Sequence, residues 1–280
     1  MTLDVSDYGT SDFLEILKRK RPDLLTLKRE MLPSSLPDMP WRSNTSGAPS
    51  FPQPGNLLEG TTILAAVYKE GVIIAGDRQA TEGIQVGERR IEKVYEVDTY
   101  SAIAIAGVAG PCIEMAKLFQ VQVEFYEKIE GSILSLEGKA NYLSNMVKSN
   151  LGMALQGLYV IPIFAGYDLK RKQGKIFKYD VTGGRYEESD HYAIGSGGKD
   201  ARSTLKKLYR PGMSRDELLK LVTEALWDAA DEDLGTGGPD FIRGIFPTVK
   251  FIDQNGVSDV PDSEIKELYT ELFDRLRDRN

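Results

Sequence analysis

A threonine next to a glycine is the first residue of this sequence whose type and position suggest a nucleophile. It lies in the triplet Gly60-Thr61-Thr62, where a proline-rich segment gives way to a strand-like one. Cleavage before Thr61 would give its hydroxyl a free α-amine on the same residue, with a reference pKa of about 7.7–8.0 that suits a base near neutral pH. Such an amine activates a weak hydroxyl nucleophile without a histidine. This suits a chain with a single histidine, His191, although a Gly-Thr-Thr triplet alone has little specificity.

A carboxylate is predicted to lie near this threonine. Residues 61–69 and 72–78 have strand-like sequences separated by a Glu-Gly turn, so they are expected to pair as a hairpin. With the turn centred on the glutamate, Thr61 is expected opposite Gln79. Asp77 is then within two positions across the strands and on the same face.

A lysine and a backbone amide are predicted to come from a second hairpin, formed by 93–97 and 101–106. In this hairpin Lys93 falls opposite Ile105, beside Gly107. If the two hairpins share one sheet, the threonine, the carboxylate, the lysine and the Gly107 backbone meet at one end of it.

These four groups would have complementary roles in acyl transfer. Lys93, as an ammonium, would lower the pKa of the Thr61 hydroxyl and discourage protonation of the amine. Asp77 would hold Lys93 in place and keep it charged, and the Gly107 N–H would donate to an oxyanion. Spacing alone, however, favours a second interpretation, in which Asp77 and Lys93 form a surface or edge ion pair.

The elements that must position these residues alternate in groups. The predicted strands are 61–69, 72–78, 93–97, 101–106, 159–168, 175–181, 192–194 and 248–253. The predicted helices are 111–129, 136–158, 199–209, 215–231 and 262–277, the fourth opening with a capping box at Ser214 and Glu217. Strands, a helix pair, strands and another helix pair are typical of two stacked sheets with helices outside. The pattern alone indicates an α/β or α+β class.

Composition narrows the function classes. The formal charge of −7 argues against a nucleic-acid binder, which normally has a basic surface. A single cysteine, Cys112, excludes an intrachain disulfide and fits a reducing compartment. One cysteine and one histidine cannot form a zinc site of the Cys/His type, and no metal is expected. The N-terminus lacks the basic-then-apolar order of a signal peptide, and the longest uncharged run, 149–167, is interrupted by Gly, Asn, Gln and Pro.

Residues 1–60 differ in composition from the rest of the chain. Seven of the 13 prolines fall there. Residues 11–31 are expected to form two short amphipathic helices separated at Pro22, and 32–57 has the composition of a linker.

The remaining candidates have ordinary structural interpretations. Residues 195–199 are glycine-rich but lack the spacing of a phosphate-binding loop, so a tight strand-to-helix turn is expected. Residues 233–238 are predicted to be a loop that ends a helix. His191 is predicted at a strand edge, and Cys112 in a helix, buried.

From Thr61 to about Asp259 the chain resembles proteasome β subunits, which are N-terminal nucleophile hydrolases. The matching motifs, in family order, are Gly60-Thr61-Thr62, Gly76-Asp77-Arg78, Lys93, Gly107, Gly195-Ser196-Gly197, and Asp233 with Thr236-Gly237-Gly238. Each motif is weak, but six in register over some 200 residues are specific. The long N-terminal segment and residues 237–248 resemble the actinobacterial type.

The resemblance implies roles for individual positions. Thr61 would be the nucleophile and, after cleavage of the Gly60–Thr61 bond, its amine would be the base. Asp77 and Lys93 match the family's charge pair, and Gly107 matches its oxyanion donor. Ser196 and Asp233 match residues that form hydrogen bonds around the threonine amine. Thr236 stands where many members have serine, and its hydroxyl is expected to keep that bond. Gly107 also matches the substrate cleft, together with four positions that suggest a pocket for apolar side chains: Ala80, Thr81, Ile105 and Ala109.

The implied fold is α+β, a four-layer αββα sandwich of two stacked, mainly antiparallel sheets. Residues 1–60 would be a propeptide and 61–280 the catalytic domain. The implied assembly has two heptameric β rings, 14 β subunits in all, between two rings of α subunits. A ring ATPase would feed it unfolded polypeptides. A cytoplasmic location, with no cofactor and with neither nucleic acid nor membrane as a partner, is expected.

Two alternatives stay open at this stage. The first is the related two-ring bacterial protease that shares the threonine start, although that family is shorter and lacks a long propeptide. The second is a non-catalytic ring subunit of the proteasome type. Such subunits usually lose the nucleophile or its lysine, whereas Thr61, Asp77, Lys93, Ser196 and Asp233 are all present here.

Overall fold

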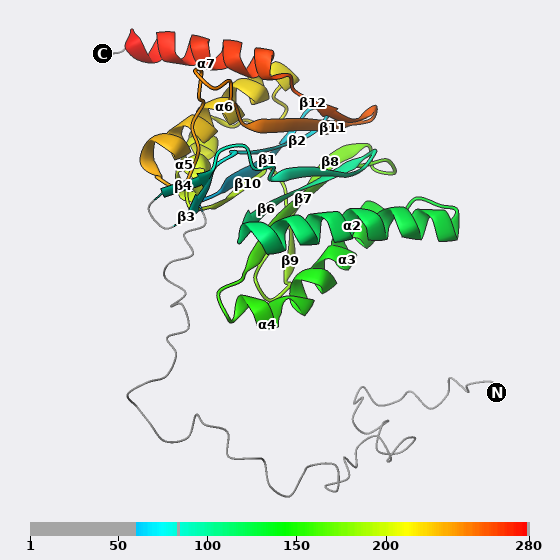
Figure 1. Ribbon diagram of the computed structural model, residues 1–280. Coiled ribbons are helices and arrows are strands. Elements are labelled where there is room, and N and C mark those ends of the chain that lie inside the picture. Colours follow the sequence, from blue (N-terminus) through cyan, green and yellow to red (C-terminus); the bar gives the residue numbers. More distant parts are fainter. Residues whose placement is uncertain (1–59, 83–84, 279–280) are drawn as a thin grey trace, which may run out of the picture. The chain divides into compact units, whose positions relative to one another are not determined.

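Two five-stranded sheets lie face to face in the computed structural model, which describes residues 60–82 and 85–278 (Figure 1). The first sheet has the order β10-β1-β2-β11-β12 and the second β5-β6-β7-β8-β9, with antiparallel neighbours throughout. The first sheet contains β1 (Thr62–Tyr68), β2 (Gly71–Gly76), β10 (His191–Gly195), β11 (Thr248–Asp253) and β12 (Gly256–Asp259). The second contains β5 (Val94–Asp98), β6 (Ser101–Gly107), β7 (Val160–Asp168), β8 (Gln173–Tyr179) and β9 (Arg185–Glu188).

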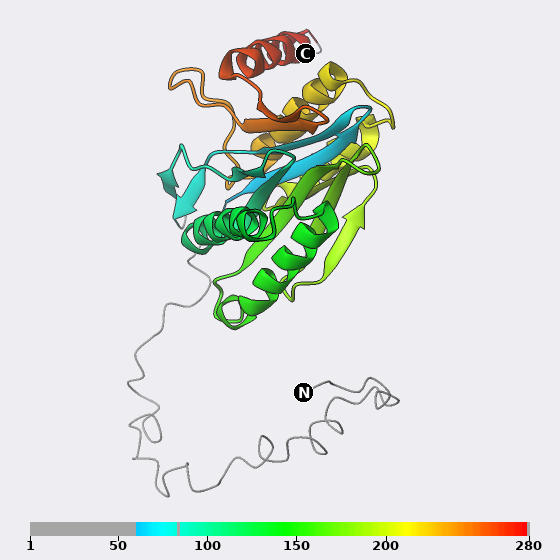
Figure 2. The same cartoon turned by 90° about the vertical axis from the view of Figure 1, so that its right-hand side faces the viewer.

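Helices cover the outer face of each sheet, which gives four layers (Figures 1 and 2). The first sheet packs against α5 (Gly198–Leu208), α6 (Arg215–Glu232) and α7 (Asp262–Arg277). The second packs against α2 (Ala109–Glu130) and α3 (Leu136–Ser149). The α+β sandwich with αββα layering is therefore confirmed.

Strand β1 is buried on both faces, so it holds the residue that precedes it firmly. Ile63 and Ala65 point into the layer between the two sheets, and Leu64 and Ala66 point into the layer covered by α5 and α6. All four are fully buried. This is the two-residue alternation of a strand, with apolar side chains on both sides instead of one.

The two predicted hairpins form, but they do not share a sheet. The first is β1–β2, in one sheet, and the second is β5–β6, in the other. The prediction of a common sheet is wrong, because the two hairpins stack through the apolar layer between the sheets.

The registers of the hairpins were predicted unequally well. Ile63 pairs with Gly76, so extending the β1–β2 ladder places Arg78 opposite Thr61, one position away from the predicted Gln79. The second register is confirmed, since Val94 pairs with Ala104 and the Ile105 N–H donates to the Lys93 carbonyl at 3.0 Å.

Among the helices, the capping box of α6 is confirmed, but the predicted helix 136–158 is too long. Ser214 accepts from the N–H of Glu217, whose side chain accepts from the Ser214 N–H. The helix from Leu136 ends at Ser149, and a short α4 (Leu151–Ala154) follows. The Asn150 side chain lies between them and donates to the Leu158 carbonyl at 3.3 Å, which turns the chain back toward β7.

Four short strands escaped the sequence analysis: β3 (Ala80–Glu82), β4 (Gln85–Glu88), β9 and β12. The first two pair only with each other, and β9 and β12 lie at sheet edges. Their residues are largely polar and exposed, so they lack the apolar alternation that identifies a strand.

The structure also bears on the membrane-spanning segment and the N-terminal helices that the sequence analysis considered. No helix within the described part of the chain is long and apolar enough to cross a membrane. The helices predicted within 11–31, like nearly all of the predicted propeptide, lie outside the described residues.

Candidate active site

Thr61 lies immediately before β1 and is buried, with 5% of its surface exposed. Its Oγ1 donates to the Gly60 carbonyl at 2.7 Å. Its N–H donates to Ser196 Oγ at 3.3 Å, and its carbonyl accepts from the Ser196 N–H at 2.8 Å. These bonds continue the β1–β10 ladder past the end of the strand, so the threonine backbone is fixed by the sheet.

The two sheets each contribute one member of a buried ion pair. Asp77 follows β2 in the first sheet, and Lys93 precedes β5 in the second. Lys93 Nζ lies 2.7 Å from Asp77 Oδ1 and 3.1 Å from the Gly60 carbonyl oxygen. Because both side chains are at least 95% buried, the surface ion pair that spacing favoured is wrong.

Burial lowers the pKa of Lys93 below its usual value, and the charge of Asp77 opposes this shift. The ammonium contacts two further oxygens, the carbonyls of Gly60 and Gln79. A buried ammonium surrounded by acceptors is held in position while it remains easier to deprotonate than an exposed lysine.

The Asp77 carboxylate is saturated with donors. Besides Lys93 it accepts from the N–H groups of Thr62 at 2.7 Å and of Gln79 and Gly237 at 2.9 Å. Three backbone amides and one ammonium offset the cost of burying the charge. The carboxylate therefore ties β1, the segment after β2, the loop after α6 and Lys93 together.

A second hydrogen-bonded chain lies on the other side of Thr61. Ser196, in the turn between β10 and α5, donates to Asp233 Oδ2 at 2.5 Å, and Thr236 Oγ1 donates to the same oxygen at 2.6 Å. Thr236 Oγ1 also lies 2.7 Å from Thr62 Oγ1. The threonine at position 236 thus keeps its hydroxyl bonded, with Asp233 and Thr62 as its partners in place of the amide of Thr61.

The turn that carries Ser196 requires glycine. Gly195 has φ +110°, and a β-carbon there would lie 1.8 Å from the Thr61 carbonyl oxygen. The strand-to-helix turn predicted for 195–199 is confirmed, and its close approach to the backbone of Thr61 explains its glycine.

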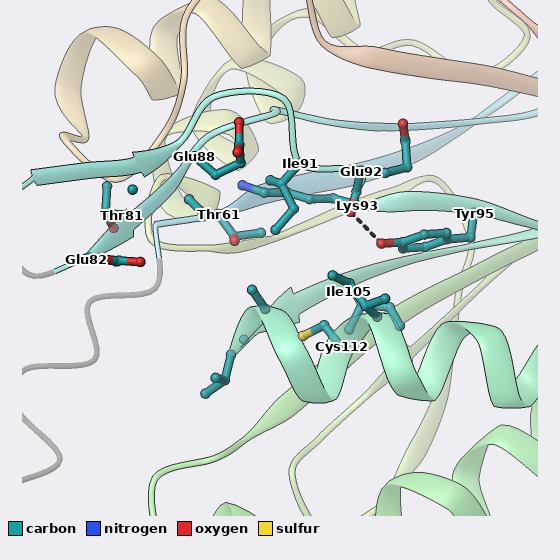
Figure 3. A pocket seen from close by; sticks show the side chains of 16 residues that line it. Thr61, Thr81, Glu82, Glu88, Ile91, Glu92, Lys93, Tyr95, Ile105 and Cys112 are labelled. Carbon is teal, nitrogen blue, oxygen red and sulfur yellow. Dashed lines mark hydrogen bonds between the residues drawn. The ribbon is translucent and has the colours of Figure 1, made fainter. Parts of the chain in front are cut away.

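A cavity of about 640 Å³ opens beside Thr61 and Lys93 (Figure 3). All five residues predicted for the substrate cleft line it: Ala80, Thr81, Ile105, Gly107 and Ala109. In Figure 3, Thr61 and Lys93 lie on one side of the cavity, while Ile105 and Cys112 lie on the side of α2.

Further lining residues were not predicted. The apolar ones include Ile91, Tyr95 and Ile113, and the acidic ones are Glu82, Glu88 and Glu92. The carboxylates of Glu88 and Glu92 point away from Ile105 and Cys112 in Figure 3, so the part of the cavity next to α2 is apolar. Cys112 is in a helix and buried, as predicted, but it also lines this cavity.

Gly107 lines the cavity and has φ +134°. Among the residues that the structure describes, the Gly60 carbonyl accepts from Thr61 Oγ1 and Lys93 Nζ, and the Gly107 amide is not a donor to it. The oxyanion role of Gly107 stays a prediction.

The chain is similar to known proteins over most of its length. A family model described as proteasome subunit matches residues 58–241. The chain belongs to the proteasome subunit family. A protein of Acidimicrobium ferrooxidans named proteasome subunit beta is 54% identical over 220 residues, which cover 79% of this chain and 81% of the relative. A proteasome subunit beta of Streptomyces griseus is 48% identical over 267 residues, covering 95% of this chain and 89% of the relative.

These relatives confirm the resemblance to proteasome β subunits of the actinobacterial type. They do not assign roles to single residues. Within the proteasome fold of this chain, the six polar residues predicted for the site, from Thr61 to Thr236, lie in one connected group of hydrogen bonds.

Three members of this group were missed in the sequence. Thr62 links Asp77 and Thr236, Gln79 contacts both Asp77 and the Leu234 carbonyl, and Gly237 donates to Asp77. The Thr62 hydroxyl could have been noticed as part of the Gly-Thr-Thr triplet. Gln79 and Gly237 bind Asp77 through backbone N–H groups, which leave no signal in side-chain chemistry.

Proposed function

We propose that this proteasome β subunit is a threonine endopeptidase that activates itself by cleaving the Gly60–Thr61 bond. The observation that carries the proposal is the position of the Gly60 carbonyl. Its oxygen lies 2.7 Å from Thr61 Oγ1 and 3.1 Å from Lys93 Nζ, so a hydroxyl and a cation converge on the bond to be broken.

Self-cleavage proceeds in two steps. The Thr61 hydroxyl oxygen attacks the Gly60 carbonyl carbon, the C–N bond breaks, and the hydroxyl proton is transferred to the departing amine, which leaves an ester. Water then hydrolyses the ester, giving a Gly60 carboxylate and Thr61 with a free hydroxyl and a free amine. Lys93 stabilises the negative charge that develops on the carbonyl oxygen in the first step.

Peptide hydrolysis repeats this chemistry on a substrate carbonyl. The α-amine of Thr61 accepts the hydroxyl proton and Lys93 stabilises the ionised hydroxyl, while Asp77 positions Lys93. Ser196 and Asp233 orient the amine, supported by the 3.3 Å contact of Ser196 Oγ with the Thr61 nitrogen, and Thr236 holds the Asp233 carboxylate. The Gly107 amide donates to the oxyanion of the substrate.

Substrate specificity comes from the cavity next to Thr61. Ala80, Thr81, Ile105 and Ala109 line it, and its wall near α2 is apolar, which favours an apolar side chain before the scissile bond. Unfolded polypeptides are the substrate class, because the site must receive an extended chain.

Membership of the proteasome family makes the chain a component of a larger complex, which supports a proposal for its assembly and location. We place it in heptameric β rings between rings of α subunits, served by a ring ATPase, in the cytoplasm. Residues 1–60 act as a propeptide that blocks the amine until assembly, and 61–280 form the catalytic domain.

The test is the intact mass and N-terminal residue of the chain after co-expression with its α partner. Loss of residues 1–60 and a new N-terminus at Thr61 are expected. Reaction with a β-lactone or epoxyketone probe should then modify Thr61. A chain that stays uncleaved and unmodified in assembled particles would instead indicate a structural ring subunit.

A further inference from the structure

Two glycines from distant parts of the chain interlock at the cleavage site. A β-carbon on Gly60 would lie 2.0 Å from the carbonyl oxygen and 2.3 Å from the α-carbon of Gly235. Conversely, a β-carbon on Gly235 would lie 2.6 Å from the Gly60 α-carbon. Neither position leaves room for a side chain while the other residue is in place.

The loop on the Gly235 side has little freedom to withdraw. Thr236 N–H donates to the Asp233 carbonyl at 3.1 Å, and the Leu234 carbonyl accepts from Gln79 Nε2 at 3.0 Å. On the far side, Gly237 N–H is bonded to Asp77. A shift of the loop that relieved a clash at Gly235 would therefore strain the bond from Gly237 to Asp77 and the bond between Leu234 and Gln79.

A hydroxyl holds Gly60 as well. The Gly60 N–H donates to Thr81 Oγ1 at 3.0 Å. With its carbonyl between Thr61 Oγ1 and Lys93 Nζ, residue 60 is thus fixed at its amide, its α-carbon and its carbonyl.

We infer that Thr81 and Gly235 form a clamp that selects glycine at position 60 and aligns its carbonyl for self-cleavage. Both are positioning residues, and the inference rests on the proposed self-cleavage at Thr61. Because Gly60 leaves with the propeptide, the clamp acts on maturation more than on peptide hydrolysis. Any larger residue at position 60 displaces the carbonyl from the hydroxyl and the ammonium.

The first test changes the residue that the clamp holds. Gly60→Ala in the full chain, co-expressed with the α partner, should slow the appearance of the Thr61 N-terminus about 100-fold, because a displacement of about 1 Å costs that much in an aligned reaction. Gly55→Ala, the same substitution elsewhere ahead of the cleavage site, should leave the rate unchanged. Cleavage of Gly60→Ala at the wild-type rate would overturn the clamp.

The second test separates maturation from catalysis. Thr81→Val removes the acceptor for the Gly60 amide and keeps the shape of the side chain, and Thr81→Ser keeps the hydroxyl. Self-cleavage of Thr81→Val should fall about 10-fold more than its peptide hydrolysis, measured after Thr61 is exposed by an unrelated protease acting on an N-terminal fusion. Thr81→Ser should restore the ratio. Equal losses in both reactions would mean that Thr81 merely supports the site, and would refute its role in the clamp.

Gly235→Ala completes the set. Its precursor should stay uncleaved in assembled particles, and exposure of Thr61 by the external protease should recover measurable peptide hydrolysis. If Gly235→Ala hydrolysed no peptide even after the external protease had exposed Thr61, Gly235 would be needed for the structure of the whole site, and its specific role in the clamp would be refuted. The wild-type chain distinguishes failure of the clamp from failure of the proposed self-cleavage. If the wild-type chain also remains uncleaved, the proposed self-cleavage is refuted, and the clamp is refuted with it.

Discussion

A lysine–aspartate pair whose lysine is buried lies at each end of β5. At the start of the strand, Lys93 pairs with Asp77, and at its last residue, Asp98 pairs with Lys139 from α3. Both lysines are buried, and burial lowers the pKa of both, that of Lys139 to about 8. The residue types, the burial of the two lysines and the direction of their pKa shifts therefore do not distinguish the two ends of β5.

The surroundings of the two ammonium groups do distinguish them. The described ion pairs of Lys139 are with Asp98 and, at 3.8 Å, with Glu127. Asp98 in turn accepts from the Tyr100 N–H and the Ser101 hydroxyl, which closes the turn between β5 and β6. Lys93 instead contacts a backbone carbonyl that a hydroxyl also contacts. A buried lysine is a catalytic candidate when it faces a bond and a nucleophile, and a lowered pKa alone does not make it one.

The largest effect is expected from removing the proposed nucleophile, Thr61, which lies beside Lys93 and has no counterpart assigned beside Lys139. Thr61→Ala should leave the precursor uncleaved and reduce peptide hydrolysis on the order of 10⁶-fold, because it removes the hydroxyl that forms the acyl intermediate. Intact mass and a fluorogenic peptide assay on assembled particles measure both. Normal processing of this variant would refute self-cleavage and remove the basis of the comparison.

The same substitution at the two lysines should separate catalysis from stability. Lys93→Met should assemble but lose about 10²–10³-fold in peptide hydrolysis and block processing, since the carbonyl oxygen loses a charged donor. Lys139→Met should keep its activity per assembled particle and lose about 3 kcal/mol of unfolding free energy, because Asp98, whose side chain is only 14% exposed, is left without its cation.

Urea unfolding of the full chain and a peptide assay on assembled particles give the two readouts for each variant. If Lys139→Met lost activity without losing stability, the two pairs would not differ in the way that their surroundings indicate.

The position of Lys93 could be predicted from the sequence, whereas the contact between Lys139 and Asp98 could not. The β5–β6 register, with Lys93 opposite Ile105, followed from alternation and turn position, and the structure confirms it. Lys139 lies in a helix whose contact with Asp98 depends on how α3 packs on the second sheet, 41 residues away in the chain. Tertiary packing of that kind leaves no local pattern to read.

A smaller effect is expected in the pH dependence of peptide hydrolysis. The Thr61 amine must be neutral to accept a proton, so activity should fall as pH decreases below its pKa, with a reference value of about 7.7–8.0. Lys93 must stay charged, and because burial lowers its pKa, the fall at high pH should begin below the pH expected for an exposed lysine.

Asp77→Asn should move that upper limb to still lower pH, since it removes the charge that raises the pKa of Lys93. The profile of kcat/KM on assembled particles, with Lys139→Met as the control, measures these shifts. An upper limb that stayed in place in Asp77→Asn would mean that Lys93 does not set it.

For the candidate site as well, the residues could be identified from the sequence, but the way the two sheets bring them together could not. The resemblance to proteasome β subunits named the polar residues correctly as neighbours, yet the geometric argument for them assumed one shared sheet. The structure brings Asp77 and Lys93 together across two stacked sheets instead, through the apolar layer that contains Ile63 and Ala104. Both hairpins have apolar residues on both faces, and such a pattern does not tell pairing within a sheet from stacking between sheets.

The smallest effect is expected at two hydroxyls, that of Ser101 beside Asp98 and that of Thr236 in the group of hydrogen bonds around Thr61. Ser101 donates to Asp98 at 2.6 Å, and Thr236 donates to Asp233 at the same distance. Thr236→Ser keeps the donor and should change peptide hydrolysis less than about 2-fold, whereas Thr236→Val loses one hydrogen bond to a charged group and should lower it about 10-fold. Ser101→Ala, by contrast, should lower the unfolding free energy by about 1–3 kcal/mol and leave kcat/KM unchanged. If Thr236→Val retained full activity, Asp233 would not need its second donor, and a large loss in Thr236→Ser would instead show that catalysis depends on the methyl group that distinguishes threonine from serine.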